Sequence, residues 1–138
     1  MRDQLHVCHD AESLAVHARN WLVRLMNQHL ASSQRPFSLA LAGGSTPKRM
    51  YQLLAELPAG EIDWRRVLLM WGDERNVPCD DAESNFRMVK ENLLDHIAIP
   101  AENVLPVPNP GESAGAAADA YEKLLKQTLP TTGKRALP

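Results

Sequence analysis

The sequence predicts an α/β fold, a three-layer Rossmann-like arrangement in which a parallel sheet carries helices on both faces. Residues 37–42 (FSLALA) and 67–71 (VLLMW) are short apolar runs bounded by turn-forming residues, which is typical of buried parallel strands. Segments with the spacing of amphipathic helices precede, separate and follow these runs. Because few strands are expected, we interpret residues 1–138 as a single incomplete domain, truncated at its C-terminal side.

Two helices are expected around the first strand. The first begins after Asp10, a residue that favours helix N-termini, and runs to about residue 30. Its apolar stripe is placed at Leu14, Ala18, Trp21, Leu22, Leu25 and His29. The second begins at Pro47, which suits the first helical position, and ends before Pro58. Its apolar face is placed at Met50, Leu53, Leu54 and Leu57.

After the second strand, a helix is expected from about Ser84 to Ile97. A short third strand follows over residues 103–107, where two prolines limit its hydrogen bonding. The final helix spans residues 112–129, and the tail 131–138 has no predicted element. The apolar stripe of the final helix is placed at Ala114, Ala117, Ala118, Tyr121, Leu124 and Leu125.

The turn after the first strand has the composition of an anion site. Gly43 and Gly44 lack a Cβ, so their backbone can adopt positive φ and bring N–H groups close to a ligand. Ser45 or Thr46 can cap the following helix or offer a hydroxyl to a phosphate oxygen. A glycine-rich turn without a ligand would have the same sequence. The spacing matches neither nucleotide-binding glycine pattern, which disfavours nucleotide cofactors.

A second polar cluster follows the second strand. The carboxyl ends of neighbouring parallel strands open onto one edge, so Asp73 and Arg75 are expected to face the first turn. Arg75 can bind a phosphate with two hydrogen bonds, and Asp73 can hold a hydroxyl, a histidine or a water. Glu74 can do the same or pair with Arg75, while a solvated charged loop is the alternative for all three.

Other polar residues leave two interpretations open. Ser84 and Asn85 fit a helix cap, and Asn85 also fits a hydrogen-bonding group in the same pocket. Arg87 fits either the pocket or the surface. The five histidines and two cysteines lack metal-ligand or disulfide spacing, so no metal site is expected.

The composition disfavours nucleic acid and membrane as partners. A net charge of −2 and a pI near 6.2 provide no general attraction for nucleic acid or an anionic lipid surface. No apolar stretch approaches the roughly 20 residues of a membrane span, and the N-terminus lacks a signal-peptide core, so we expect a cytoplasmic protein. No feature of the sequence indicates an oligomeric state.

Four motifs, taken in order, resemble the 6-phosphogluconolactonase family, within the superfamily of glucosamine-6-phosphate isomerases. They are LALAGGSTP, WGDERNVP, ESNFRM and NVLPVP. The resemblance implies hydrolysis of 6-phosphoglucono-δ-lactone to 6-phosphogluconate in the oxidative pentose phosphate pathway. It implies a phosphorylated sugar lactone as the ligand and no metal or organic cofactor.

The resemblance also assigns roles to residues. The family's phosphate loop falls on Gly43, Gly44, Ser45 and Thr46. Its phosphate-contacting arginine falls on Arg75, and its asparagine on Asn85. Its acidic residue, which orients the catalytic histidine and a water, falls on Asp73. The aminosugar-phosphate isomerase or deaminase branch, the alternative, typically has Asp-Glu-Tyr where this chain has Asp-Glu-Arg, which favours the lactonase.

Family members continue with a strand and an Asp-Gly-His-Thr segment that supplies the catalytic histidine, and the 138 residues contain no such segment. The chain is therefore expected to be an N-terminal portion that is nearly inactive alone, with Asp73 as an orienting group or weak base. A noncatalytic sugar-phosphate-binding module is one alternative. Another is a chain with too little sheet to fold alone, which would expose an unpaired strand edge.

Overall fold

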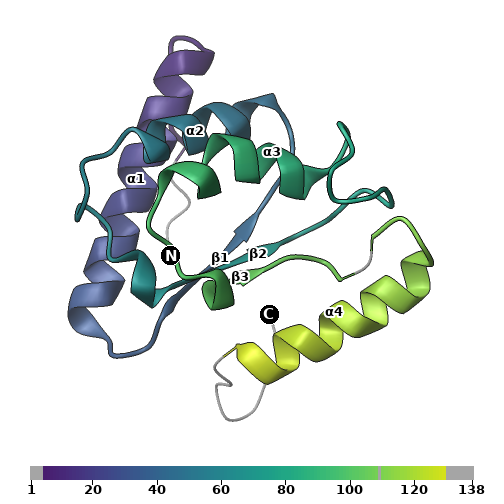
Figure 1. Cartoon of the computed structure of the whole chain (residues 1–138). Helices are drawn as coiled ribbons and strands as arrows, with labels where there is room; N and C mark the ends of the chain where they lie inside the picture. Colours follow the sequence, from purple (N-terminus) through teal and green to yellow (C-terminus); the bar gives the residue numbers. More distant parts are fainter. Residues whose placement is uncertain (1–4, 109, 130–138) are drawn as a thin grey trace.

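The computed structural model describes residues 5–108 and 110–129 and contains a three-stranded parallel sheet in the order β1-β2-β3 (Figure 1). The strands are β1 (Phe37–Leu41), β2 (Val67–Trp71) and β3 (Val104–Leu105). The two predicted apolar runs are thus confirmed as neighbouring strands. β3 is only two residues long because Pro106, which follows it, has no N–H to continue the ladder.

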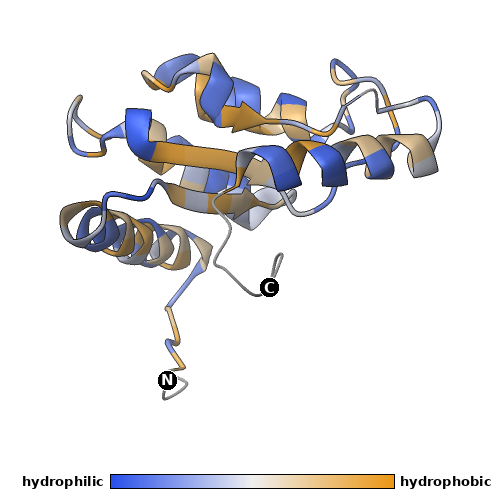
Figure 2. Ribbon diagram, turned by 90° about the horizontal axis from the view of Figure 1, so that it is seen from below, coloured by the Kyte–Doolittle hydropathy of each residue, from blue (hydrophilic) through white to orange (hydrophobic). Residues whose placement is uncertain are grey.

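Helices cover both faces of this sheet, as predicted. Helices α2 and α3 lie on one face and α4 on the other (Figure 1). Figure 2 shows the strands as a strongly hydrophobic band, with helices of mixed hydropathy around them. The α-helices are α1 (Ala11–Ser32), α2 (Ser45–Ala55), α3 (Asn85–Asn92) and α4 (Ala114–Thr128). Short 3₁₀ turns occupy Trp64–Arg66, Leu94–His96 and Ala101–Asn103.

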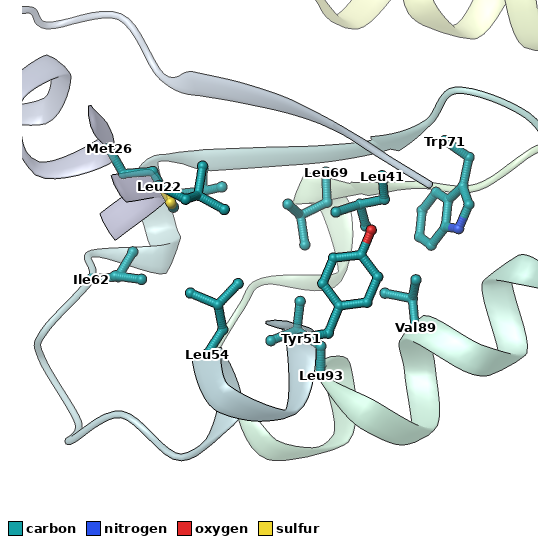
Figure 3. Close-up of a cluster of buried hydrophobic side chains, with 11 residues drawn as sticks. Leu22, Met26, Leu41, Tyr51, Leu54, Ile62, Leu69, Trp71, Val89 and Leu93 are labelled. Carbon is teal, nitrogen blue, oxygen red and sulfur yellow. The ribbon is translucent and has the colours of Figure 1, made fainter. Parts of the chain in front are cut away.

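The main core lies between the sheet and the first three helices. Tyr51 and Leu54 of α2 pack with Val89 of α3 and with Leu93, the residue that follows α3, against the strands (Figure 3). All five residues of β2 are buried, so both faces of this strand are covered. Burial on both faces explains why its sequence is continuously apolar rather than alternating.

The predicted stripe of α1 is right at Leu22 but wrong at three other positions. Leu14, Trp21 and Leu25 are 40%, 54% and 38% exposed, and the residues of this helix that are buried are Ala15, Leu22 and Met26. The apolar residues of α1 occupy a wide arc, so contacts with another helix decide which of them face inward. The guanidinium of Arg49 on α2 donates two hydrogen bonds of 2.8 Å to the Glu12 carboxylate, a contact between exposed side chains that is compatible with this rotation of α1.

The helix expected over residues 84–97 ends at Asn92. The Asn92 amide donates to Met88 O (2.7 Å) and accepts from the Gln52 side chain of α2 (2.8 Å). Leu93 then leaves helical geometry, with φ −139° and ψ −61°. The Asn92 side chain thus bonds to α2 at the point where α3 ends.

Smaller differences concern helix starts. α2 begins at Ser45, so Pro47 is the third helical residue and not the first. Proline is tolerated at the third position because an N–H there would also lack an intrahelical partner. α4 begins after Ser113 and buries only Ala117 of its predicted stripe. The predicted tail 131–138 lies outside the described residues.

Candidate functional site

The two polar loops begin at one edge of the sheet. Leu41, the last residue of β1, is in register with Trp71, the last residue of β2. The N–H of Gly72 then donates to the carbonyl of Leu41 (2.9 Å), which prolongs the pairing into the loop. The premise that the 43–46 turn and the 73–75 loop leave adjacent strand ends is therefore confirmed.

Two tyrosines fix these strand ends. The Tyr51 hydroxyl accepts from Ala42 N (3.0 Å) and donates to Ala42 O (2.9 Å), next to the glycine turn. The Tyr121 hydroxyl accepts from Trp71 N (2.7 Å) and lies 3.0 Å from Leu105 O, where Pro106 ends β3. Burial raises the pKa of both phenols, which keeps the hydroxyls protonated. Neither role was predicted from the sequence.

The N-terminus of α2 has no side-chain cap. Its first residue follows Gly44, whose φ of 106° is a conformation that residues with a Cβ rarely adopt. Gly44 makes no side-chain cap, and the predicted capping by Ser45 or Thr46 does not occur. In the described residues, the other three α-helices are each capped by a side chain, those of Asp10, Ser84 and Ser113.

Asn85 joins the two loops. Its Nδ2 donates to the carbonyl of Asp73 (3.2 Å), and its Oδ1 lies so close to Gly43 that a Cβ there would be 2.1 Å away. Only a glycine at position 43 leaves room for this amide. Asn85 is 6% exposed, and it is the first residue of α3 after the Ser84 cap. The predicted cap is confirmed at Ser84, whereas Asn85 does not line the cleft beside Asp73 and Arg75, and its role in ligand binding stays a prediction.

Glu74 has a role that the sequence analysis missed. Its carboxylate accepts from the N–H groups of Asn85 (2.7 Å) and Phe86 (2.8 Å), the first two residues of α3. The third N–H of this helix, on Arg87, is satisfied by the Ser84 hydroxyl (3.2 Å). The N-terminus of α3 is therefore already occupied by an anion of the chain itself, unlike that of α2.

Positive charge near the site comes from Arg75 and Lys48. Both side chains are exposed, and within residues 5–108 and 110–129 neither forms an ion pair. Arg49 is paired with Glu12, as described above. Arg87 is paired with Glu91 (2.7 Å) and also donates to Asp80 O, which settles its ambiguity in favour of the surface.

No hydrogen bond among the described residues joins Arg75 to residues 43–46. A cleft of about 190 Å³ is lined by Asp73, Arg75 and Tyr121, without the 43–46 turn. A larger cleft of about 500 Å³, lined by Trp64 and Ile97 among others, lies near the start of β2, at the opposite end of the strand.

The described part of the chain has no group of three histidine, cysteine, aspartate or glutamate side chains arranged to hold a metal ion. Within the same ranges, every helix is too short or too polar to cross a membrane.

Comparisons with known proteins identify relatives over nearly the whole chain. Residues 9–137 match the family model described as glucosamine-6-phosphate isomerases/6-phosphogluconolactonase. The 6-phosphogluconolactonase of Mycobacterium leprae is 37% identical over 129 residues, which cover 91% of this chain and 51% of the relative. That of Nostoc sp. is 32% identical over 126 residues, with the same two coverages.

Solved structures of similar proteins give the same result. The 6-phosphogluconolactonase from Leishmania guyanensis superposes with a TM-score of 0.83 at 28% identity, covering 99% of this chain and 56% of that one. The enzyme from Trypanosoma brucei superposes with a TM-score of 0.78 at 30% identity, covering 94% and 52%. The chain thus spans about half the length of the curated relatives it matches. From the extent of these matches, the chain belongs to the glucosamine-6-phosphate isomerase/6-phosphogluconolactonase family.

Proposed function

We propose that this chain forms the phosphate-binding half of a 6-phosphogluconolactonase, an enzyme that hydrolyses 6-phosphoglucono-δ-lactone to 6-phosphogluconate. The observation that carries the proposal is the uncapped N-terminus of α2, which Asn85 connects to the loop that bears Asp73 and Arg75. A dianionic phosphate fits such a helix end because free N–H groups and the helix dipole both favour negative charge. The named relatives support the identity of the ligand.

The residues of the site divide the work of binding. Phosphate oxygens are bound by the N–H groups of the 43–46 turn and by the hydroxyls of Ser45 and Thr46. The planar guanidinium of Arg75 donates two parallel hydrogen bonds to the same phosphate. Asp73, two residues before Arg75 in the same loop, orients a water or a basic group against the lactone carbonyl. Attack by water breaks the ring ester, the ring oxygen takes up a proton, and a carboxylate is left. Anchoring the distant phosphate holds the lactone in place for this attack.

The histidine that the resemblance implies as general base would lie in the half of the relatives that this chain does not match. We therefore expect little hydrolysis from the 138 residues alone, since a general base is worth about 10²–10⁴-fold in rate. A cytoplasmic setting belongs to the same proposal, and it agrees with the free thiols of Cys8 and Cys79.

Titration calorimetry with 6-phosphogluconate, the reaction product, tests the proposal on the chain as it stands. Saturable binding is expected, and gluconate, which lacks the phosphate, should bind far more weakly. Replacing Arg75 by alanine should weaken 6-phosphogluconate binding about 10- to 100-fold, because a hydrogen bond to a charged group contributes about 1.5–3 kcal/mol.

The matched control is Arg87→Ala, which removes an arginine whose guanidinium is already paired with Glu91. This variant should bind 6-phosphogluconate as the parent chain does. Equal affinities for 6-phosphogluconate and gluconate, or equal losses in the two arginine variants, would exclude a phosphate site at Arg75.

A further inference from the structure

Glu74 is bonded to two parts of the site at once. Its Oε1 accepts from Arg75 N and Asn85 N, each at 2.7 Å. Its Oε2 accepts from Phe86 N at 2.8 Å and from the Ser84 hydroxyl at 3.3 Å. One carboxylate thus fastens the backbone of the 73–75 loop to the first turn of α3, with all its bonds made to the chain itself.

The residues on either side of Glu74 are the ones expected to meet the ligand. Among the described residues, the side chains of Asp73 and Arg75 form no hydrogen bond or ion pair, whereas that of Glu74 makes four bonds. The loop therefore has one fixed side chain between two free ones. Because Glu74 anchors the backbone of the loop, it determines the backbone positions from which the Asp73 and Arg75 side chains extend.

The effect of Glu74 extends to the glycine turn through Asn85. Glu74 fixes the backbone of Asn85, whose side chain bonds to Asp73 O and lies against Gly43. A path of direct contacts thus runs from the carboxylate to the start of the anion-binding turn. The negative charge of Glu74 is compensated at the N-terminus of α3, which limits its repulsion of a nearby phosphate.

We propose that Glu74 is a positioning residue for the phosphate site: it sets the separation between the 43–46 turn and Arg75 without contacting the ligand. The identity of the ligand in this inference rests on the proposed function, whereas the contacts of Glu74 do not. Replacing Glu74 by glutamine keeps the size of the side chain but replaces one acceptor oxygen with an NH₂ group, which faces N–H donors. The loop should then shift relative to α3.

A double-mutant cycle in 6-phosphogluconate affinity tests this role. Glu74→Gln is expected to weaken binding about tenfold or more in the parent chain and to have little further effect in the Arg75→Ala background, because Arg75 is the group that it positions. Glu83→Gln, an exposed glutamate just before α3, is the control and should leave affinity unchanged. Losses of the same factor in both backgrounds would show a merely structural role and overturn the proposal, as would full affinity in Glu74→Gln.

Amide NMR separates this proposal from the proposed function. Without ligand, Glu74→Gln should move the Gly43 and Gly44 N–H resonances, and Glu83→Gln should not; unmoved glycine resonances would overturn the positioning role even if 6-phosphogluconate failed to bind the parent chain. Should Glu74→Gln fail to fold, Glu74→Asp keeps the charge at α3 but shortens the reach, and the same losses and shifts are expected from it.

Discussion

At the scale of single residues, the glycine at position 43 is explained by one neighbour. Its usefulness to the site was predicted from freedom of the backbone, but the positive φ belongs to Gly44, and Gly43 is required because the Asn85 amide occupies the place of a Cβ. The partner is 42 residues away in sequence, so no local pattern could reveal it. Glu74 was missed for the same reason, since its N–H donors on α3 are 11 and 12 residues later.

Gly43→Ala is expected to lower the free energy of unfolding by about 1–3 kcal/mol and to weaken 6-phosphogluconate binding, because the new methyl group must displace the Asn85 amide. Urea denaturation and calorimetry measure the two effects. Gly72→Ala is the matched control, since a Cβ there would meet its nearest atom, Leu41 O, at 3.6 Å, an ordinary contact. Equal stability losses in both variants would contradict the account.

At the scale of elements, the sequence predicted well those features that nearby residues determine and predicted poorly those that contacts between distant elements determine. The bounds of β1 and β2 were predicted almost to the residue because an apolar run between turn residues favours a strand, but the expected burial along the whole strand holds for β2 alone. The predicted burial of Leu14, Trp21 and Leu25 on α1 and the predicted end of α3 were wrong because both depend on α2, against which α1 packs and whose Gln52 bonds to Asn92. Such contacts exist only after the chain has folded.

Tyr121 of α4, whose hydroxyl bonds to the last residue of β2, gives a prediction at this scale. Tyr121→Phe leaves the buried N–H of Trp71 without its acceptor and should cost about 1–3 kcal/mol of stability in urea denaturation at neutral pH. Burial raises the pKa of Tyr121 in the folded chain, so the unfolded chain loses this proton first, and stability should fall as the pH rises past about 10.

The loss of stability at alkaline pH separates the contribution of the Tyr121 hydroxyl from that of its ring. In Tyr121→Phe, the fall in stability between pH 9 and pH 11 should be smaller than in the parent chain, because one titrating phenol is gone. An alkaline fall of the same size in both proteins, or no loss of stability at neutral pH, would show that the phenol hydroxyl does not stabilise the strand end.

At the scale of the whole molecule, the edge of the sheet formed by β1 is open. In the described residues, β1 pairs with a strand on one side only, and its Ser38 and Ala40 side chains are exposed. Three large apolar residues of α1, Leu14, Trp21 and Leu25, are also exposed. Exposed apolar groups and an open strand edge both favour association.

Concentration-dependent self-association is therefore expected in sedimentation velocity. Trp21→Lys should reduce it, because it places a charge on the exposed stripe of α1. Asn20→Lys, the same charge on the neighbouring exposed residue, should reduce it less. A parent chain that remains a sharp monomer at every concentration would show that these surfaces need no cover.

The central claim is that two loops from adjacent strands bind one phosphate together. Titrating the ¹⁵N-labelled chain with 6-phosphogluconate, and following each N–H by NMR, tests it directly. We expect the amides of residues 43–46 and the Nε–H of Arg75 to shift along a single saturation curve. Shifts confined to residues around the larger cleft, such as Gly60 and Ile97, or different curves for the two loops, would contradict the account.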